Sequence, residues 1–274
     1  MSEVLLSDKY DFEIDEQISS KSLLRYPGGK TRAVYLISRF FPHDLKYLLS
    51  PFLGGGSVEL HFAAKGVKVY GYDIFSPLVE FWQCLKTEPH QLADEVEKYF
   101  PLSKDAFYSL QETHTTLKTK LQRAAAYYVL NRSSFSGSTL SGGMSPGHPR
   151  FTPSAIDRVR EFRNPNIYVK KGDYKSSLLQ HPELFTYLDP PYLIKSWLYG
   201  RKGDAHKDFD HEGLAELLQN REKWVLSYND CSTIRKLYKK FNIISPNWKY
   251  GMSNDKESKE VLIFSKDIDL KKIK

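Results

Sequence analysis

Apolar positions along the chain follow two periods. Short runs rich in β-branched and aromatic residues predict strands, and stretches with apolar residues three or four positions apart predict helices. Strands are expected at the start of residues 47–66, over 67–73, and within 166–173, 184–192, 223–230, 241–245 and 259–265. Helices are expected over 33–41, at the end of 47–66, over 76–85 with Ser76 as N-cap, near 153–162, and over 211–220 and 231–240. This strand–helix alternation predicts an α/β fold with a doubly wound, mostly parallel sheet.

The middle of the chain breaks that alternation. Residues 88–131 show helical spacing without a convincing strand, and residues 132–152 are rich in Ser, Gly and Pro, which is typical of a loop. The simplest division is a discontinuous α/β domain, residues 21–84 and 160–274, interrupted by a mainly helical segment, residues 85–159. Residues 1–20 are expected to form a loose acidic arm.

Composition narrows the class of protein. The 274 residues include 18 Tyr, 16 Phe and 4 Trp, which is ample core material and excludes disorder of the whole chain. With only two cysteines, a disulfide scaffold is not expected, which suits a reducing, cytoplasmic location. The cysteines form no CxxC pair and the eight histidines are scattered along the chain, so we expect no metal site. No apolar run approaches the ~20 residues that span a bilayer. The net charge of +7 suits a polyanionic partner, although a solvated basic surface is the alternative.

The first candidate site is Pro51–Leu60, PFLGGGSVEL, where three glycines stand between a strand and a helix. Glycines at such a turn let the backbone approach a ligand without interference from a Cβ atom. Asp73 ends the next strand about twenty residues later, where doubly wound folds bind a ribose hydroxyl. The pattern is not GxGxxG and no phosphate-binding Lys-Ser/Thr pair follows it. It therefore favours a nucleoside cofactor without a pyrophosphate, and the alternative is a glycine turn chosen for tight strand–helix packing.

The second candidate site is the tetrapeptide Asp189-Pro190-Pro191-Tyr192, which directly follows a predicted strand. The two prolines fix an extended backbone and remove two donors, leaving the Asp189 carboxylate and the Pro190 carbonyl as acceptors. Two acceptors can bind both protons of an exocyclic amine and favour the pyramidal geometry in which it attacks. Tyr192 offers a face on which a flat base can stack. These four residues are the candidate catalytic residues; the alternative is a strand-terminating turn with a packed Tyr.

A third motif, Arg25-Tyr26-Pro27-Gly28-Gly29-Lys30, lies upstream of both. It could be a plain turn before a helix. Alternatively, its aromatic ring, two glycines and cation could grip the amino-acid end of a zwitterionic cofactor, with Lys30 near the carboxylate.

Together these motifs resemble the alpha class of DNA adenine-N6 methyltransferases, the Dam-like family that uses S-adenosylmethionine. The order YPGGK, PFLGGGSVEL, recognition insertion and DPPY agrees, and the similarity covers nearly the whole chain after residue 20. The resemblance implies a Rossmann-like methyltransferase domain and an inserted target-recognition domain. It also implies a cofactor site of Tyr26, Pro27, Gly28, Gly29 and Lys30 at the methionine end, Phe52, Gly54 and Gly56 beneath it, Asp73 at the ribose, Asp173 and Tyr174 at the adenine, and Asp189 beside the methyl group.

The resemblance further implies double-stranded DNA as a partner, a target base flipped out of the duplex, and a restriction endonuclease of the same system as a candidate partner. Asn131, Arg132 and Phe135 resemble the family's Asn-Arg…Phe-Asn-Gly stretch, with Ser136 where Asn is usual. Residues 136–150 differ from the segment of GATC-specific members, which puts a GATC target in doubt. Residues 195–207, with Lys195, Arg201 and Lys202, suit a flap over DNA. A surface loop is the alternative for both segments.

Three other functions remain open at this point. Cytosine-N4 methyltransferases face the same chemical problem, but Ser-Pro-Pro-Tyr is commoner there, so Asp189 favours adenine. Enzymes that methylate glutamine amides in proteins usually carry Asn at that first position. A catalytically inactive DNA-binding module with a methyltransferase fold is the third alternative. The expected function is site-specific methylation of adenine N6 in DNA.

Overall fold

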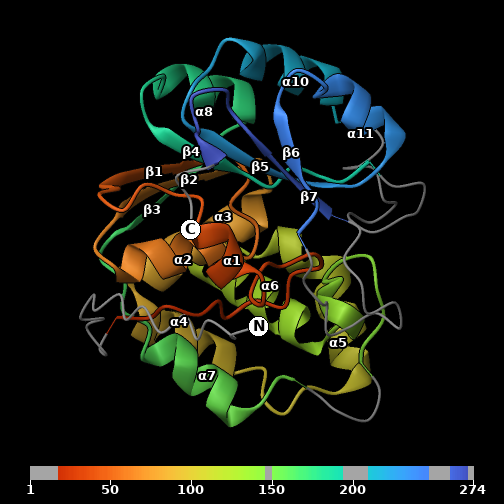
Figure 1. Ribbon diagram of the computed structural model, residues 1–274. Helices are drawn as coiled ribbons and strands as arrows, with labels where there is room; N and C mark the ends of the chain where they lie inside the picture. Colours follow the sequence, from red (N-terminus) through yellow and green to blue (C-terminus); the bar gives the residue numbers. More distant parts are fainter. Residues whose placement is uncertain (1–17, 146–149, 194–208, 247–259, 271–274) are drawn as a thin grey trace, which may run out of the picture.

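A computed structural model describes residues 18–145, 150–193, 209–246 and 260–270. Its centre is a seven-stranded sheet with the order β3-β2-β1-β4-β5-β7-β6 (Figure 1). The strands are β1 (Tyr47–Ser50), β2 (Lys68–Asp73), β3 (Ile167–Lys171), β4 (Phe185–Leu188), β5 (Trp224–Asn229), β6 (Asn242–Ile244) and β7 (Glu260–Phe264). Strands β1 to β5 pair in parallel, and β7 is antiparallel to β5 and β6. The predicted α/β class with a mostly parallel sheet is confirmed.

Helices cover both faces of this sheet (Figure 1). One face carries α8 (Tyr174–Gln180), α10 (His211–Gln219) and α11 (Ser232–Leu237). The other carries α1 (Val34–Ser38), α2 (Ser57–Ala64) and α3 (Ser76–Thr87), and beyond them α4 (Pro89–Glu97), α5 (Lys104–Thr113), α6 (Lys120–Ser133) and α7 (Pro153–Arg160). The N-cap of α3 is Phe75 and not the expected Ser76, which is already helical.

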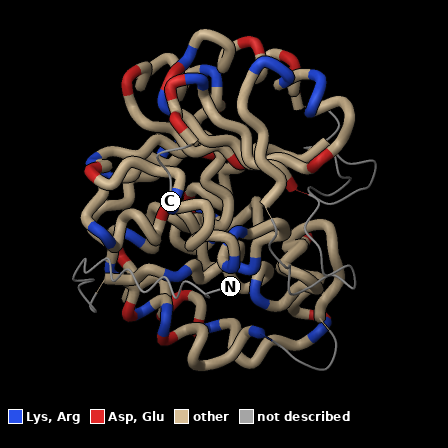
Figure 2. Tube along the Cα trace, in the orientation of Figure 1, with Lys and Arg blue, Asp and Glu red and all other residues tan. Residues whose placement is uncertain are grey.

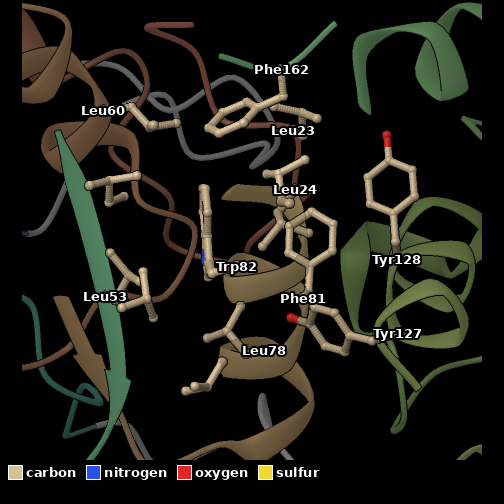
Figure 3. Packing of buried hydrophobic residues seen from close by; sticks show 14 of the residues in the cluster. Leu23, Leu24, Leu53, Leu60, Leu78, Phe81, Trp82, Tyr127, Tyr128 and Phe162 are labelled. Atoms are coloured by element: carbon tan, nitrogen blue, oxygen red, sulfur yellow. The ribbon is translucent and has the colours of Figure 1, made fainter. Parts of the chain in front are cut away.

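The segment expected to form a separate recognition domain shares a hydrophobic core with the sheet. Leu48 and Val69 of the sheet belong to the same buried cluster as Phe81 of α3 and Tyr128 of α6. The rings of Phe81 and Tyr128 stack with centroids 5.3 Å apart, and Figure 3 shows this region around Trp82. Helices α4 to α7 therefore extend one layer of the fold, and their separation as a domain of residues 85–159 stays a prediction.

The strand order reverses between β1 and β4. These strands are parallel neighbours, yet the chain continues from β1 toward β2 and from β4 toward β5, on opposite sides. In open α/β sheets, ligands bind outside the carboxyl ends of the strands at such a switch point. The glycine motif follows β1 and the DPPY tetrapeptide follows β4, so the fold brings the first two candidate sites together. Within the described ranges, no helix is long and apolar enough to cross a bilayer.

Candidate active site

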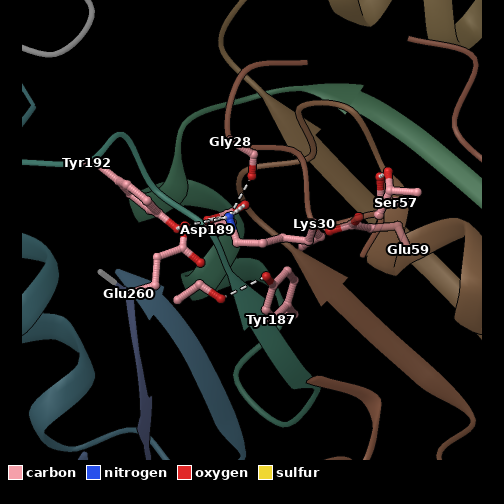
Figure 4. A network of polar contacts seen from close by, with 11 residues as sticks. Gly28, Lys30, Ser57, Glu59, Tyr187, Asp189, Tyr192 and Glu260 are labelled. Atoms are coloured by element: carbon pink, nitrogen blue, oxygen red, sulfur yellow. Dashed lines mark hydrogen bonds and ion pairs between the residues drawn. The ribbon is translucent and has the colours of Figure 1, made fainter. Parts of the chain in front are cut away.

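Lys30 connects the upstream motif to the DPPY tetrapeptide (Figure 4). Its side chain is only 3% exposed, and its Nζ donates to Asp189 Oδ1 and Oδ2 at 2.9 and 2.8 Å and to the Gly28 carbonyl at 2.8 Å. The turn that aims it closes through the Gly29 amide on the Tyr26 carbonyl, with Gly28 at φ +73°, where glycine is favoured. Three acceptors match the three ammonium protons. Lys30 therefore faces Asp189, and its position near the carboxylate of a cofactor stays a prediction.

Two carboxylates share this lysine. Glu260, at the start of β7, is 6% exposed, and its Oε1 lies 3.7 Å from Lys30 Nζ and accepts a hydrogen bond from the Tyr192 hydroxyl. Burial lowers the pKa of Lys30, but the charges of Asp189 and Glu260 outweigh it, so the pKa lies above its ordinary value. Burial raises the pKa of Asp189, Lys30 opposes that effect, and Glu260 adds to it. Lys30 is therefore cationic between two acidic groups.

Glu59 of α2 is another acid near Lys30, and Figure 4 shows it in the same region. Its side chain is 3% exposed, and Ser50 Oγ donates to its Oε1 at 2.7 Å. Burial raises the pKa of this carboxyl to about 7, although the Ser50 hydrogen bond opposes the shift. Glu59 also contributes to the raised pKa of Lys30. Sequence reasoning missed Glu59 and Glu260; the available signal was an acid within each otherwise apolar element, SVELHFAA and EVLIF.

The glycine motif accommodates two aromatic side chains. A Cβ atom on Gly55 would lie 2.7 Å from Tyr26 Cβ, and one on Gly56, at φ +65°, would lie 2.8 Å from the Trp82 ring. Gly54, at φ +47°, has Tyr26 as its nearest neighbour and accepts a hydrogen bond from Trp82 Nε1 at 3.1 Å. The packing alternative thus explains Gly55 and Gly56, and the approach of Gly54 and Gly56 to a cofactor stays a prediction.

Asp73 holds the end of β2 against this turn. Its Oδ2 accepts from the Gly54 amide at 3.1 Å and its Oδ1 from the Phe75 amide at 2.9 Å. Burial raises the pKa of Asp73, and these amide hydrogen bonds oppose the rise. Each oxygen keeps a lone pair that could accept from a ribose hydroxyl.

Aromatic rings gather beside Asp73 at the same edge of the sheet. The Phe52 ring stacks on Tyr174 with a centroid distance of 5.7 Å, and Phe209 lies 5.6 and 5.4 Å from the two rings. Asp173 caps α8 by accepting from the Ser176 amide at 2.9 Å. Phe52 and Tyr174 therefore pack against each other beside Asp173, and a ligand shared by the three stays a prediction.

The segment after α6 holds the candidate DNA contacts. Asn131 is fully buried, where its side chain accepts from the Arg25 amide at 2.8 Å and donates to the Arg25 carbonyl at 2.9 Å. The Arg132 guanidinium donates to the carbonyls of Arg150 and Leu23. Phe135, by contrast, is 62% exposed. Asn131 therefore anchors this segment, whereas Phe135 projects from it.

The remaining DNA candidates, Lys195, Arg201 and Lys202, lie outside the described residues. Burial lowers the pKa of Arg25, and the charges of Arg132 and Arg150 lower it further, so these three cations lie near one another. Figure 2 shows basic and acidic positions interspersed over both helical layers.

In the described part of the chain, no group of three or more His, Cys, Asp or Glu side chains could hold a metal ion.

Comparisons with known proteins identify a matching family and several relatives. Residues 26–252 match the family described as D12 class N6 adenine-specific DNA methyltransferase. The chain is 24% identical to a DNA adenine methylase of Vibrio cholerae over 248 residues, 83% of this chain and 88% of the relative. It is 25% identical to a type II methyltransferase of Methanocaldococcus jannaschii over 260 residues, 81% and 89% of the two chains. A DNA N-6-adenine-methyltransferase of Escherichia phage P1 is 31% identical over 127 residues, 43% of this chain and 16% of that protein.

Proposed function

Because the chain belongs to the D12 class of N6-adenine-specific DNA methyltransferases, we propose that Asp189, Pro190, Pro191 and Tyr192 bind the target adenine and direct its amine to the methyl donor. Membership of the family makes the protein an enzyme that acts on adenine in DNA and implies an S-adenosylmethionine-type donor. One observation carries the residue assignment. The Asp189 carboxylate, held by the buried Lys30 ammonium, lies at the switch point of the sheet next to the Tyr192 ring, whose centroid is 5.0 Å from that ammonium.

The residues around the glycine motif fit S-adenosylmethionine itself. Asp73 keeps lone pairs for the ribose hydroxyls, and the rings of Phe52 and Tyr174 offer apolar faces for the adenine, with Asp173 at its edge. The buried carboxyl groups of Glu260 and Glu59 and the partly buried carboxylate of Asp189 lie around Lys30, which favours a positively charged ligand. Tyr26, Pro27, Gly28 and Gly29 would border the methionine end, and Lys30 would act there through Asp189.

The chemistry assigned to this chain is positioning and proton transfer. When bound, S-adenosylmethionine supplies an electrophilic methyl group on a sulfonium sulfur, which departs as a neutral thioether with the electron pair of the broken C–S bond. The Asp189 carboxylate and the Pro190 carbonyl would accept hydrogen bonds from the two N6 protons and so point the nitrogen lone pair at the methyl carbon. The new N–C bond leaves a positive charge on the amine. Asp189 then takes one N6 proton, which restores a neutral base and leaves a neutral carboxylic acid.

The target base must leave the duplex to reach Asp189. Extrusion costs a few kcal/mol of unstacking, and stacking on the Tyr192 ring compensates part of it. The exposed Phe135, with Arg132 and its neighbours Arg25 and Arg150, supports a contact between the segment after α6 and DNA, since arginines near one another favour a phosphate. Lys195, Arg201 and Lys202 are proposed to contact DNA from the segment that follows Tyr192.

Nucleoside analysis tests the proposal. DNA incubated with the protein and S-adenosylmethionine is digested, and its methylated nucleosides are identified by mass spectrometry. The proposal expects N6-methyladenine. N4-methylcytosine would show the alternative amine as the target, and saturable DNA binding without cofactor binding or methylated product would show an inactive module.

A restriction endonuclease is proposed as a partner of the same system. Besides the Methanocaldococcus relative, a modification methylase of Streptococcus sanguinis is 25% identical over 222 residues, 72% of this chain and 32% of that protein. Both names belong to restriction–modification enzymes. Sequencing of methylated bases in DNA from a host that expresses the protein would define the site, and DNA methylated there should resist an endonuclease that cleaves it.

A further inference from the structure

We propose that Glu260 is a positioning residue of methyl transfer, which fixes the Tyr192 ring through its hydroxyl and keeps Lys30 in place while Asp189 carries the proton taken from the amine. The inference rests on the proposed function of the DPPY tetrapeptide. It assigns a role to β7, a strand that follows the DPPY tetrapeptide by 68 positions and belongs to none of the motifs described above.

The geometry gives Glu260 two neighbours that matter for the reaction. Its Oε1 accepts the Tyr192 hydroxyl and lies 3.7 Å from Lys30 Nζ. Its Oε2 is buried and has no hydrogen-bond partner among the described residues. A buried, unsatisfied carboxylate oxygen is costly, so a purely structural glutamate here is disfavoured. Tyr192, whose ring is assigned to the base, is thus held at its far end by a charged acceptor.

The titratable groups around Glu260 come from four segments of the chain. The titratable groups that interact with this cluster are Lys30 before α1, Glu59 on α2, Tyr187 on β4, and Asp189 and Tyr192 after β4. Lys30 is the single cation of this set. When Asp189 is ionised, Lys30 faces two carboxylates. When Asp189 is protonated, Glu260 is, among the described residues, the remaining charged group within 4 Å of the Lys30 ammonium.

This arrangement matches the two halves of the reaction. Before transfer, Asp189 is an anion that accepts from the amine and from Lys30. After transfer, one N6 proton moves to an Asp189 oxygen, which removes the negative charge beside Lys30. Glu260 then keeps the ammonium paired until Asp189 returns its proton to solvent, so Lys30 neither loses its own proton nor leaves the site.

Conservative variants separate the two effects. Glu260→Gln keeps an acceptor for the Tyr192 hydroxyl and removes the charge, whereas Tyr192→Phe removes the hydrogen bond and keeps the charge. Glu183→Gln is the matched control. It makes the same substitution at a glutamate that also lies 3.7 Å from a lysine, Lys223, but whose side chain is 86% exposed. Turnover, KM for DNA and for S-adenosylmethionine, and the pH dependence of kcat are measured for each, with thermal unfolding as a check on the fold.

We expect Glu260→Gln to lower kcat about 10- to 100-fold while each KM stays within about threefold. Because the charge of Glu260 raises the pKa of Asp189, its removal should move the acid limb of the kcat profile to lower pH. Tyr192→Phe should lower kcat without that downward shift. The control should leave both quantities unchanged.

Wild-type kcat and an unshifted acid limb in Glu260→Gln would overturn the inference. If that variant does not fold, Glu260→Asp decides: the charge remains but the carboxylate is one methylene shorter, so kcat should fall and the acid limb should stay. Wild-type kcat in Glu260→Asp would then overturn it. A wild-type protein that forms no N6-methyladenine in the same assay contradicts the proposed function instead, so the two failures are distinguishable.

Discussion

The Lys30 ammonium lies 2.9 and 2.8 Å from the two carboxylate oxygens of Asp189, although 159 positions separate the two residues. This contact ties the turn before α1 to the carboxyl end of β4. It also means that the YPGGK motif contributes to the DPPY site through its cation. Because both oxygens of the Asp189 carboxylate accept from this ammonium, the orientation of the carboxylate is fixed before any substrate binds.

Lys30→Met should strongly destabilise the protein. The substitution leaves the buried Glu260 and the partly buried Asp189 without a cation, and breaking a buried ion pair in this way typically costs ~3–5 kcal/mol. The free energy of unfolding in denaturant measures this cost. Lys98→Met, which removes an exposed lysine paired with Glu95, is the control and should leave the free energy of unfolding nearly unchanged. A Lys30→Met variant as stable as that control would contradict the charge account.

Gly56→Ala should cost more stability than Gly66→Ala. Both glycines have positive φ, +65° and +86°, so both substitutions carry a backbone penalty of ~1–2 kcal/mol. Only at Gly56 does the added Cβ meet a neighbour, the Trp82 ring at 2.8 Å, whereas Gly66 has nothing within 4 Å. Overpacking should add ~1–3 kcal/mol at Gly56, measured by denaturant unfolding. Equal losses would show that Trp82 moves aside freely.

Glu59→Gln should make stability less dependent on pH. Burial raises the pKa of Glu59 from 4.5 to about 7, so the folded chain binds a proton that the unfolded chain has lost between these values. Wild-type stability therefore falls as pH rises through this range, by about 3 kcal/mol in total. The Gln variant, which can still accept from Ser50, lacks this loss. Its advantage should be near zero at about pH 4.5 and full above about pH 7; a difference independent of pH would refute the assignment.

Asp73→Asn should weaken cofactor binding. The substitution removes the charge that strengthens hydrogen bonds to the ribose, an effect of ~1.5–3 kcal/mol, or about 10- to 100-fold in Kd. Calorimetric titration with S-adenosylmethionine measures it. Asn has one acceptor oxygen, so either the Gly54 or the Phe75 amide loses its partner and the melting temperature should fall; the titration is therefore made at a temperature at which the variant is folded. An unchanged Kd would place the ribose elsewhere.

Much of the fold was predictable, because strand and helix periods are local properties of the sequence. The runs VKVYGYD and LFTYL became β2 and β4, and the glycine turn lies between β1 and α2. The glycine motif and the DPPY tetrapeptide were both expected directly after strands, and the structure has them after β1 and β4. The N-cap of α3 moved by one residue, to Phe75, because the first turn of a helix depends on local backbone geometry as well as on residue type.

The partners of the buried charges were not predictable in the same way. The sequence motif gave no sign that packing brings Lys30 to Asp189 and Glu260. Glu260 and Glu59 lie in apolar elements whose periodicity marks the position as buried but does not show what lies opposite. Asn131 shows the reverse case: a polar residue expected at DNA is fully buried on the Arg25 backbone. Such pairings depend on tertiary contacts between distant segments.

The account depends most directly on the Asp189 carboxylate, and one comparison tests it. Wild-type protein and Asp189→Ala are assayed in parallel for methyl transfer to DNA and for DNA affinity. Because the carboxylate acts on the amine while phosphate contacts elsewhere supply most of the affinity, the variant should bind DNA nearly as well and form no detectable N6-methyladenine. Turnover of Asp189→Ala within tenfold of wild type, with DNA binding intact, would contradict the account.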